Sequence, residues 1–144
     1  MTRSLCRLLW QHGYAPLAEV PLADGRRADV MALGGRGEIW IVEVKVSLAD
    51  LRGDRKWPFY RDWCDAFWWA APEALAAELA QPAYAPHESG LILSDGHEAA
   101  MIREAPNSPL SPARRKAVTL ALARTAAERA HRLADPGFER FPGH

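Results

Sequence analysis

The chain has 144 residues, 49% of them hydrophobic, which is enough to bury one core of ordinary size but not two independent cores. Lysine plus arginine and aspartate plus glutamate both number 18, so any binding to nucleic acid must come from local patches and not from the overall charge. The cysteines and histidines show no zinc-site or disulfide spacing, and no apolar run is long enough to span a membrane. Without a recognisable signal peptide, the expected localisation is cytoplasmic.

The first third of the chain predicts one helix followed by three strands. Apolar residues recur at helical spacing over residues 3–12, and Gly13 would end that helix. The next three segments are short and apolar or rich in valine and isoleucine, as strands are, and glycines between the last two indicate a hairpin turn. The predicted strands are 16–22, 28–33 and 38–47, and the turn glycines are Gly34, Gly35 and Gly37.

Helices and strands alternate in the rest of the chain. Ser47 and Asp50 match a capping box, which predicts a helix directly after the third strand, interrupted at Gly53 and Pro58 and ending near Trp63. From the length of the chain we expect a single domain over residues 1–134, followed by a mobile tail over residues 135–144. The other predicted elements are an aromatic strand over 65–71, a short helix over 73–79, a hairpin of strands 90–94 and 99–103, and a long helix from Pro112, capped by Ser111, to about Leu133.

Two charged residues stand on the third predicted strand, which is otherwise apolar. Glu43 and Lys45 share one face of this strand because side chains alternate. A strand that is apolar on both faces lies inside a sheet, so these charges should emerge where the packed interior gives way to a cleft. Asp29 and Glu43 are symmetric about Arg36, so a loop of residues 35–37 would set them opposite each other. A slip of one residue would separate them onto opposite faces.

Paired carboxylates in this arrangement are typical of a metal site. Their Cβ atoms would lie about 5 Å apart, where like charges repel unless a cation sits between them. Mg²⁺ or Mn²⁺ would take ligands from Asp29, Glu43 and the main chain of Val44, with Lys45 placed to orient the attacking water. This is the chemistry of a metal-dependent nuclease. An exposed salt bridge between Glu43 and Lys45, with Asp29 as a surface charge, is the alternative interpretation of the same residues.

The spacing of Asp29, thirteen further residues and then Glu43-Val44-Lys45 resembles the PD-(D/E)xK nuclease superfamily. The core of that superfamily is a helix, a three-stranded meander, a helix and a further strand. Over residues 25–72 and 103–136 the sequence also resembles the MmcB-like DNA-repair family, and this likeness covers most of the chain. The resemblance implies an α/β fold of the restriction-endonuclease-like kind: a mixed central β-sheet flanked by helices, with a long C-terminal helix. It also implies a bacterial role in DNA repair, metal-binding acids at Asp29 and Glu43, and a catalytic lysine at Lys45.

Two features depart from the superfamily pattern. The first helix lacks a glutamate, and the usual Gln-x-x-x-Tyr motif begins here with Lys56 and ends with Tyr60. Whether the site has a second metal position is therefore undecided by the sequence. Glu19, on the first strand, either replaces the missing acid as a metal ligand or is a surface residue.

Polar and basic residues at three places are candidates for contacts with DNA. The first set directly precedes Asp29, the second is one helical turn apart and would share a face toward the cleft, and the third lies near a helix N-terminus, where backbone amides add to the attraction for phosphate. A solvated surface explains the basic residues as well, and Tyr60 also fits the core. The candidates are Arg26 and Arg27, Lys56 and Tyr60, and Arg114, Arg115 and Lys116.

The segment after the third strand carries arginines and tryptophans of the kind that bind single strands. Aspartates interleave with the arginines, which favours ordinary ion pairs within the segment instead. The residues are Arg52, Arg55, Arg61, Trp57 and Trp63, with Asp50, Asp54, Asp62 and Asp65.

The expected function is a divalent-metal-dependent endonuclease or exonuclease that hydrolyses phosphodiester bonds in damaged or branched DNA. A non-catalytic repair accessory that binds DNA or a repair partner through the same fold is the alternative. A metabolic enzyme acting on a small phosphorylated compound is more remote, since the sequence has no glycine-rich phosphate motif. DNA and other repair proteins are the expected partners, and the sequence fixes neither the oligomeric state nor the strandedness of the substrate.

Overall fold

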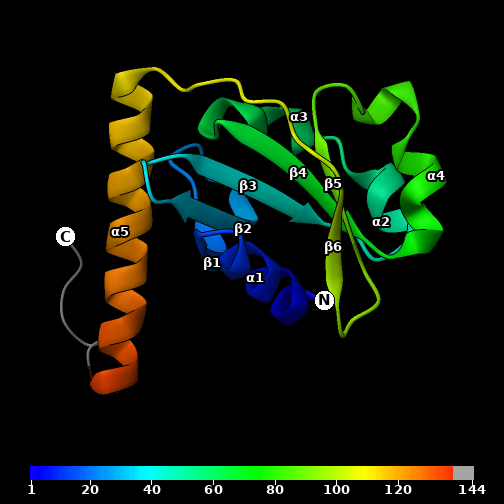
Figure 1. Cartoon of the computed structure of the whole chain (residues 1–144). Helices are drawn as coiled ribbons and strands as arrows, with labels where there is room; N and C mark the ends of the chain where they lie inside the picture. Colours follow the sequence, from blue (N-terminus) through cyan, green and yellow to red (C-terminus); the bar gives the residue numbers. More distant parts are fainter. Residues whose placement is uncertain (138–144) are drawn as a thin grey trace.

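The computed structural model describes residues 1–137 and is built on a six-stranded β-sheet (Figure 1). The strands are β1 (Tyr14–Pro21), β2 (Arg27–Gly34), β3 (Ile39–Val44), β4 (Ala66–Ala71), β5 (Gly90–Ser94) and β6 (Ala99–Arg103). They lie side by side in chain order. The pairs β1–β2, β2–β3 and β5–β6 are antiparallel, whereas β3–β4 and β4–β5 are parallel. The expected mixed sheet is confirmed.

Helices flank this sheet. The α-helices are α1 (Thr2–Gln11), α2 (Leu48–Gly53), α3 (Trp57–Tyr60), α4 (Ala76–Leu79) and α5 (Pro112–Ala134), and the 3-10 turns are η1 (Arg61–Trp63), η2 (Glu73–Leu75) and η3 (Pro82–Tyr84). The order of α1, three antiparallel strands, α2 and β4 is the order that the resemblance implied, and the long C-terminal helix is confirmed as α5. The helix predicted over 73–79 is divided between η2 and α4.

No helix within residues 1–137 combines the length and the apolar character that a bilayer span requires. Residues 138–144, which make up most of the predicted mobile tail, lie outside the described residues.

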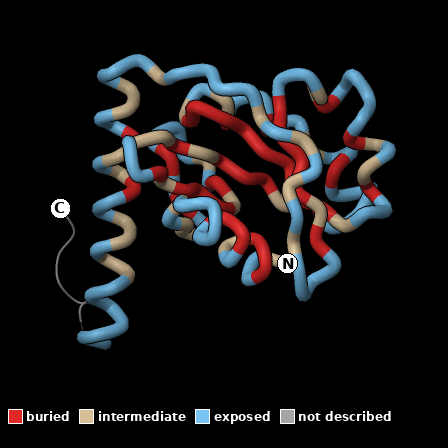
Figure 2. Tube along the Cα trace, viewed as in Figure 1, coloured by how far each residue is buried: buried red, intermediate tan, exposed pale blue. Residues whose placement is uncertain are grey.

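Both faces of the sheet are buried, as Figure 2 shows for the strands at the centre of the molecule. Along β3, Ile39 and Ile41 belong to one apolar cluster, while Trp40, Val42 and Val44 belong to or pack against the other. This alternation follows from the period of two along a strand. The prediction that this strand is central and buried on both faces is confirmed.

On one face, α1 covers the sheet. Leu5 and Leu9 are fully buried on this helix and join a cluster that contains Val30, Val42 and Trp68. Trp68 lies directly over Gly90 of β5, where a Cβ atom would stand 2.8 Å from Trp68 Cζ3 and closer still to Cε3. Glycine is required at this position because the indole ring occupies the place of a side chain.

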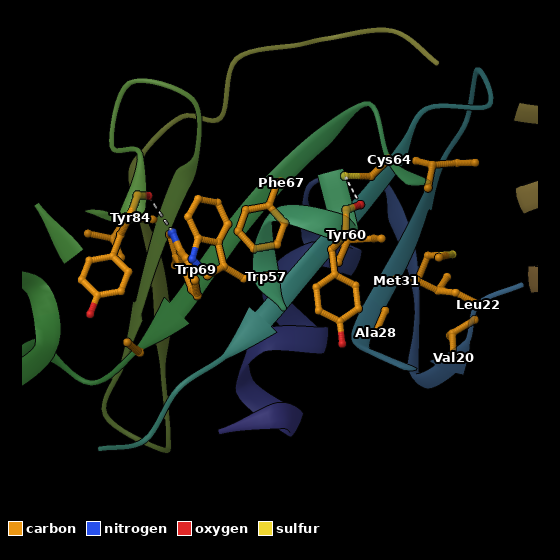
Figure 3. Close-up of a cluster of buried hydrophobic side chains, with 14 of the residues drawn as sticks. Val20, Leu22, Ala28, Met31, Trp57, Tyr60, Cys64, Phe67, Trp69 and Tyr84 are labelled. Atoms are coloured by element: carbon orange, nitrogen blue, oxygen red, sulfur yellow. Dashed lines mark hydrogen bonds between the residues drawn. The ribbon is translucent and has the colours of Figure 1, made fainter. Parts of the chain in front are cut away.

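On the other face, aromatic rings fill the space between the sheet and the segments that join its parallel strands (Figure 3). The ring of Trp69 stands edge-on to those of Trp57, Phe67 and Tyr84, an arrangement that adds to the stabilisation from area burial alone. Trp69 Nε1 donates to the carbonyl oxygen of Tyr84 at 3.2 Å, so this buried indole is satisfied.

The turn between β2 and β3 sets the register of both strands. The Gly34 amide donates to the carbonyl oxygen of Glu38 at 2.8 Å, which leaves residues 35–37 as the loop. Gly37 adopts a φ of +93°, a conformation that glycine reaches without a steric penalty. Val30 pairs with Val42, and one more step along this ladder sets Asp29 opposite Glu43. The predicted three-residue loop and its register are confirmed.

The long helix α5 packs against β1 and η1 at one edge of the sheet (Figure 1). Val118 and Leu122 are its buried apolar residues. Farther along the helix, the guanidinium group of Arg129 donates to the backbone carbonyl oxygens of Ala18 and Glu19 in β1. Glu19 has a φ of 54°, in the left-handed region that few non-glycine residues adopt.

Candidate active site

Two carboxylates face each other where β2 begins and β3 ends. Glu43 Oε2 accepts a hydrogen bond from the Asp29 amide at 3.2 Å, and Asp29 Oδ2 accepts one from the Val44 amide at 2.8 Å. Each carboxylate is thus held by the backbone of the opposite strand. The ladder between β2 and β3 has no slip, so both side chains lie on the same side of the sheet. The reciprocal hydrogen bonds then hold them there.

Glu43 lies in surroundings that disfavour its ionised form. The residue is only 3% exposed, and burial, followed by the hydrogen bond and the negative charge of Asp29, raises the pKa of Glu43 to about 9. The Asp29 amide and the Lys45 ammonium act in the opposite direction but do not outweigh these effects. A proton or another cation is therefore needed to keep two carboxylates this close.

Lys45 lies on the same face of the sheet, one step beyond the carboxylates. Its Nζ is 2.7 Å from Asp54 Oδ2 and 3.7 Å from Asp50 Oδ1. Burial alone would lower the pKa of Lys45, but the hydrogen bond and charge of Asp54, with smaller contributions from Asp50 and Glu43, raise it above its ordinary value. Lys45 is therefore a fixed, charged ammonium group.

Asp54 links this lysine to the start of α3. Its Oδ1 accepts hydrogen bonds from the amides of Lys56 at 2.8 Å and Trp57 at 3.0 Å, while Oδ2 holds Lys45. One carboxylate thereby satisfies free amides at a helix start and positions the ammonium group. Asp54 was not among the predicted site residues.

The local sequence explains why α2 begins beside the site. Ser47 is the N-cap of this helix, and its Oγ accepts from the Asp50 amide at 3.1 Å, as the capping signal predicted. The Lys45 amide donates to the carbonyl oxygen of Ala70 at 2.9 Å, which keeps the chain on the sheet until α2 starts. Leu51 then anchors α2 in the core.

These residues line an open cavity of about 480 Å³. Tyr60 contributes its ring, and its hydroxyl donates to the carbonyl oxygen of Arg27 at 3.0 Å, close to the start of β2. Burial and the nearby charge of Glu43 raise the pKa of Tyr60, so the phenol remains protonated. The lining residues are Asp29, Glu43, Lys45, Asp50, Gly53, Asp54, Arg55, Lys56 and Tyr60.

The donor set fits a hard divalent cation in part. Magnesium commonly takes one or two carboxylates and keeps several waters, and Asp29 and Glu43 supply two carboxylates that need a positive charge between them. The main chain of Val44 lies beside them, with its amide bonded to Asp29. Within residues 1–137, no cluster of three or more histidine, cysteine, aspartate or glutamate side chains has the arrangement of a metal site.

Glu19 is level with Asp29 in the ladder, between the pairs Ala18–Val30 and Val20–Ala28. Its left-handed backbone interrupts the regular alternation there. The carboxylate is well exposed, lies 3.9 Å from Arg27 and is not among the residues that line the carboxylate cavity.

The predicted DNA-binding residues fall into two groups. Lys56 is exposed and Tyr60 is buried, and both line the carboxylate cavity. Arg26, which is partly buried, and Arg27, which is exposed, precede Asp29 in the chain but are not among the residues that line that cavity. The basic triplet of α5 lies at the other end of β3, where Arg115 donates to the Gly37 carbonyl oxygen at 2.8 Å. Gly37 and Glu43 are six residues apart along extended chain, which corresponds to about 20 Å.

Arg115 has a structural contact at that distant end. It forms two hydrogen bonds with the carboxylate of Asp65, at 2.5 and 2.6 Å, and Asp65 also accepts from the amides of Ile39 and Leu110. Burial alone would raise the pKa of Asp65, but the Arg115 guanidinium and these amides hold it below its usual range. Arg114 and Lys116 are partly or fully exposed beside it.

The ion pairs expected within residues 50–65 do not form, because the partners lie outside this segment. Arg52 pairs with Glu78, Arg61 with Glu88, and Asp65 with Arg115, while Asp50 and Asp54 pair with Lys45. Trp57, proposed for a stacking surface, is buried against Trp69 instead. The capping signal at Ser47 located α2, but only the three-dimensional path of the chain shows that Asp54 returns to Lys45.

Comparisons with known proteins agree with this description. Residues 1–137 match the family model described as DNA repair protein MmcB-like. A solved protein of unknown function from Silicibacter pomeroyi is 42% identical, with a TM-score of 0.84 over 94% of this chain and 89% of that chain. A repair endonuclease from Pyrococcus abyssi is 19% identical over 58% of this chain and 44% of that chain, with a TM-score of 0.36. No curated protein matches the chain. By the family model, which spans almost its whole length, the chain belongs to the MmcB-like family of DNA repair proteins.

Proposed function

We propose that this protein is a divalent-metal-dependent nuclease that hydrolyses phosphodiester bonds in damaged or branched DNA. The observation that supports it is the reciprocal hydrogen bonding of Asp29 and Glu43, with Lys45 on the same face and the same cavity. Membership in a DNA-repair family supports DNA as the substrate. The protein is proposed to act as a single domain in the cytoplasm.

In this proposal, Asp29, Glu43 and the main chain of Val44 hold the cation, Mg²⁺ or Mn²⁺. When bound, the cation supplies Lewis-acid stabilisation of the phosphodiester and a more acidic water. Lys45 orients the attacking water and offsets the negative charge that develops on phosphate. Lys56, at the rim of the cavity, attracts the DNA backbone. Glu19 stays a candidate for a further ligand, although it does not line the cavity.

The experiment compares the wild-type protein with Asp29→Asn and Lys45→Met on single-stranded, duplex, flapped and junction DNA. Each protein is incubated with Mg²⁺, Mn²⁺ or EDTA after its fold has been checked by circular dichroism. We expect cleavage by the wild type that EDTA abolishes, and a loss of about a hundredfold or more in each variant. Glu73→Gln, which neutralises an exposed acid in η2, is the control and should cleave normally.

One contact favours the alternative of a non-catalytic accessory that binds DNA or a repair partner. The 2.7 Å ion pair with Asp54 already occupies the ammonium group on which the nuclease mechanism depends. An accessory predicts that Asp29→Asn and Lys45→Met bind DNA as the wild type does while no protein cuts any substrate. That result would overturn the nuclease proposal.

A further inference from the structure

Two arginine side chains lie over aromatic rings on the surface that leads away from the carboxylates. The Cζ atom of Arg26 is 4.1 Å from the ring centroid of Phe59, and that of Arg114 is 4.2 Å from the ring of Trp63. Phe59 is 48% exposed, so part of its ring is open to solvent. We call these four residues the arginine–aromatic surface.

A single carboxylate joins the two stacked pairs. Asp24 Oδ2 accepts hydrogen bonds from Arg26 Nη1 at 2.7 Å and from Trp63 Nε1 at 3.2 Å. Asp24 Oδ1 also accepts from the Arg26 amide at 2.9 Å. The two pairs are therefore neighbours in one continuous surface, although their residues come from three separate stretches of the fold: the turn before β2, the α3–η1 segment and the start of α5.

This surface begins at the rim of the carboxylate cavity. Arg26 precedes Asp29 by three residues of nearly extended chain, which spans about 10 Å. Phe59 is next to Tyr60, which lines the cavity and donates to the Arg27 carbonyl oxygen. From there the surface continues along α3 and η1 to the start of α5.

The charges favour a polyanion here. Asp24 is neutralised by its ion pair with Arg26. Arg114 donates to the backbone carbonyl oxygen of Asp62 at 3.0 Å, and no carboxylate of the described residues lies within ion-pair distance of its guanidinium. Arg27 is exposed, with only a 3.9 Å contact to Glu19. Arg114 and Arg27 therefore remain available to phosphate groups, whereas the charge of Arg26 is offset by Asp24.

We infer that the arginine–aromatic surface binds an unpaired stretch of DNA next to the carboxylate cavity, with bases stacked on the Phe59 ring and on the arginine planes. Only unpaired bases expose the faces that such stacking requires. The inference rests on the proposed function and adds strandedness to it: the substrate carries a single-stranded segment beside the position at which it is cut.

The test measures binding of fluorescent oligothymidylate and of a duplex of the same length by anisotropy, in EDTA. The double variant Arg26→Ala/Phe59→Ala should weaken single-strand binding by about fivefold or more and leave duplex binding unchanged. Its matched control is Arg7→Ala/Trp10→Ala, which also removes one arginine and one exposed aromatic residue, but from α1 on the opposite face of the sheet. The control should bind as the wild type does.

Arg114→Ala provides a second variant in case the turn at residues 24–26 needs Arg26 to fold. It should weaken single-strand binding severalfold, and Arg114→Lys should restore it only in part because lysine keeps the charge but offers no plane for stacking. Unchanged binding in the folded variants would overturn the inference. An equal loss for duplex DNA would overturn it as well, since the surface would then act by charge alone.

Failure of this inference can be told apart from failure of the proposed function. If the wild type cuts no substrate but the double variant loses single-strand binding, the nuclease proposal fails and the binding surface stands. If the wild type cuts DNA in Mg²⁺ and the double variant binds and cuts unpaired DNA equally well, the nuclease proposal stands and the inference fails.

Discussion

Glu43 makes the stability of the metal-free protein depend on pH. Folding raises its pKa from an ordinary value of 4.5 to about 9. The contribution of the protonated carboxyl to the stability of the fold is therefore complete below pH 4.5 and is lost as pH rises through 9. Glu43→Gln keeps the hydrogen bonds of the neutral acid without this loss. We expect it to raise the free energy of unfolding by about 3 kcal/mol at pH 7 and by almost nothing near pH 4.

Urea titrations in EDTA at several pH values measure this difference, with Glu73→Gln as an exposed control. An equal effect of Glu43→Gln at pH 4 and pH 7 would show that Glu43 is ionised in the folded protein. The same variant should also lose any stabilisation by Mg²⁺, because binding of a ligand to the folded state alone raises the melting temperature.

Asp54 and Asp50 should differ sharply in their energetic coupling to Lys45. The Lys45–Asp54 pair is nearly buried and 2.7 Å long, whereas Asp50 is 3.7 Å away and 41% exposed. Asp54→Asn retains an acceptor for the amides at the start of α3 but removes the charge, and should cost about 2–4 kcal/mol. Asp50→Asn should cost less than about 1 kcal/mol.

A double-mutant cycle with Lys45→Met measures this coupling by urea unfolding. Loss of Asp54 should cost much less once the lysine is gone, because no buried charge is then left unpaired. Equal coupling for both aspartates would mean that Lys45 moves freely between them.

At the scale of the elements, the sequence predicted the strands and the β2–β3 register well because local chemistry specifies them. The symmetry about Arg36 and the turn glycines were enough to place Asp29 opposite Glu43. Contacts between segments distant in sequence escaped prediction. Neither the return of Asp54 to Lys45 nor the burial of Trp57 leaves a periodic signal, since both depend on how the segment between β3 and β4 folds back.

The contact between β4 and β5 depends on a missing side chain. Gly90→Ala should destabilise the protein by about 1–3 kcal/mol or more, because the added methyl group meets the indole ring of the fully buried Trp68. Gly35→Ala is the matched control, since a Cβ atom there meets nothing within 4 Å. Thermal melts of both variants test the idea, and similar melting temperatures would show that Trp68 can move aside.

At the scale of the whole molecule, Arg115 and Asp65 connect the terminal helix to the β2–β3 turn and to β4. Arg115→Ala leaves a carboxylate that is 3% exposed without its cation and should cost about 3–5 kcal/mol. Lys116→Ala, one residue along the same helix, should cost less than about 0.5 kcal/mol. Because the pKa of Asp65 is lowered, this stabilisation should be lost as pH falls below 4, and acid unfolding of both variants measures it. Equal acid midpoints would contradict the assignment.

The hydrogen bonds from Arg129 to Ala18 and Glu19 bear on how copies of this protein behave at high concentration. β1 is an edge strand, and free carbonyl oxygens along such an edge are a template for pairing with a strand of another molecule. Arg129 occupies two of these oxygens, and Pro16 and Pro21 remove two amide donors from the same strand. The C-terminal helix thus protects the sheet edge, and its presence favours a protein that stays dispersed where an uncovered edge would promote aggregation.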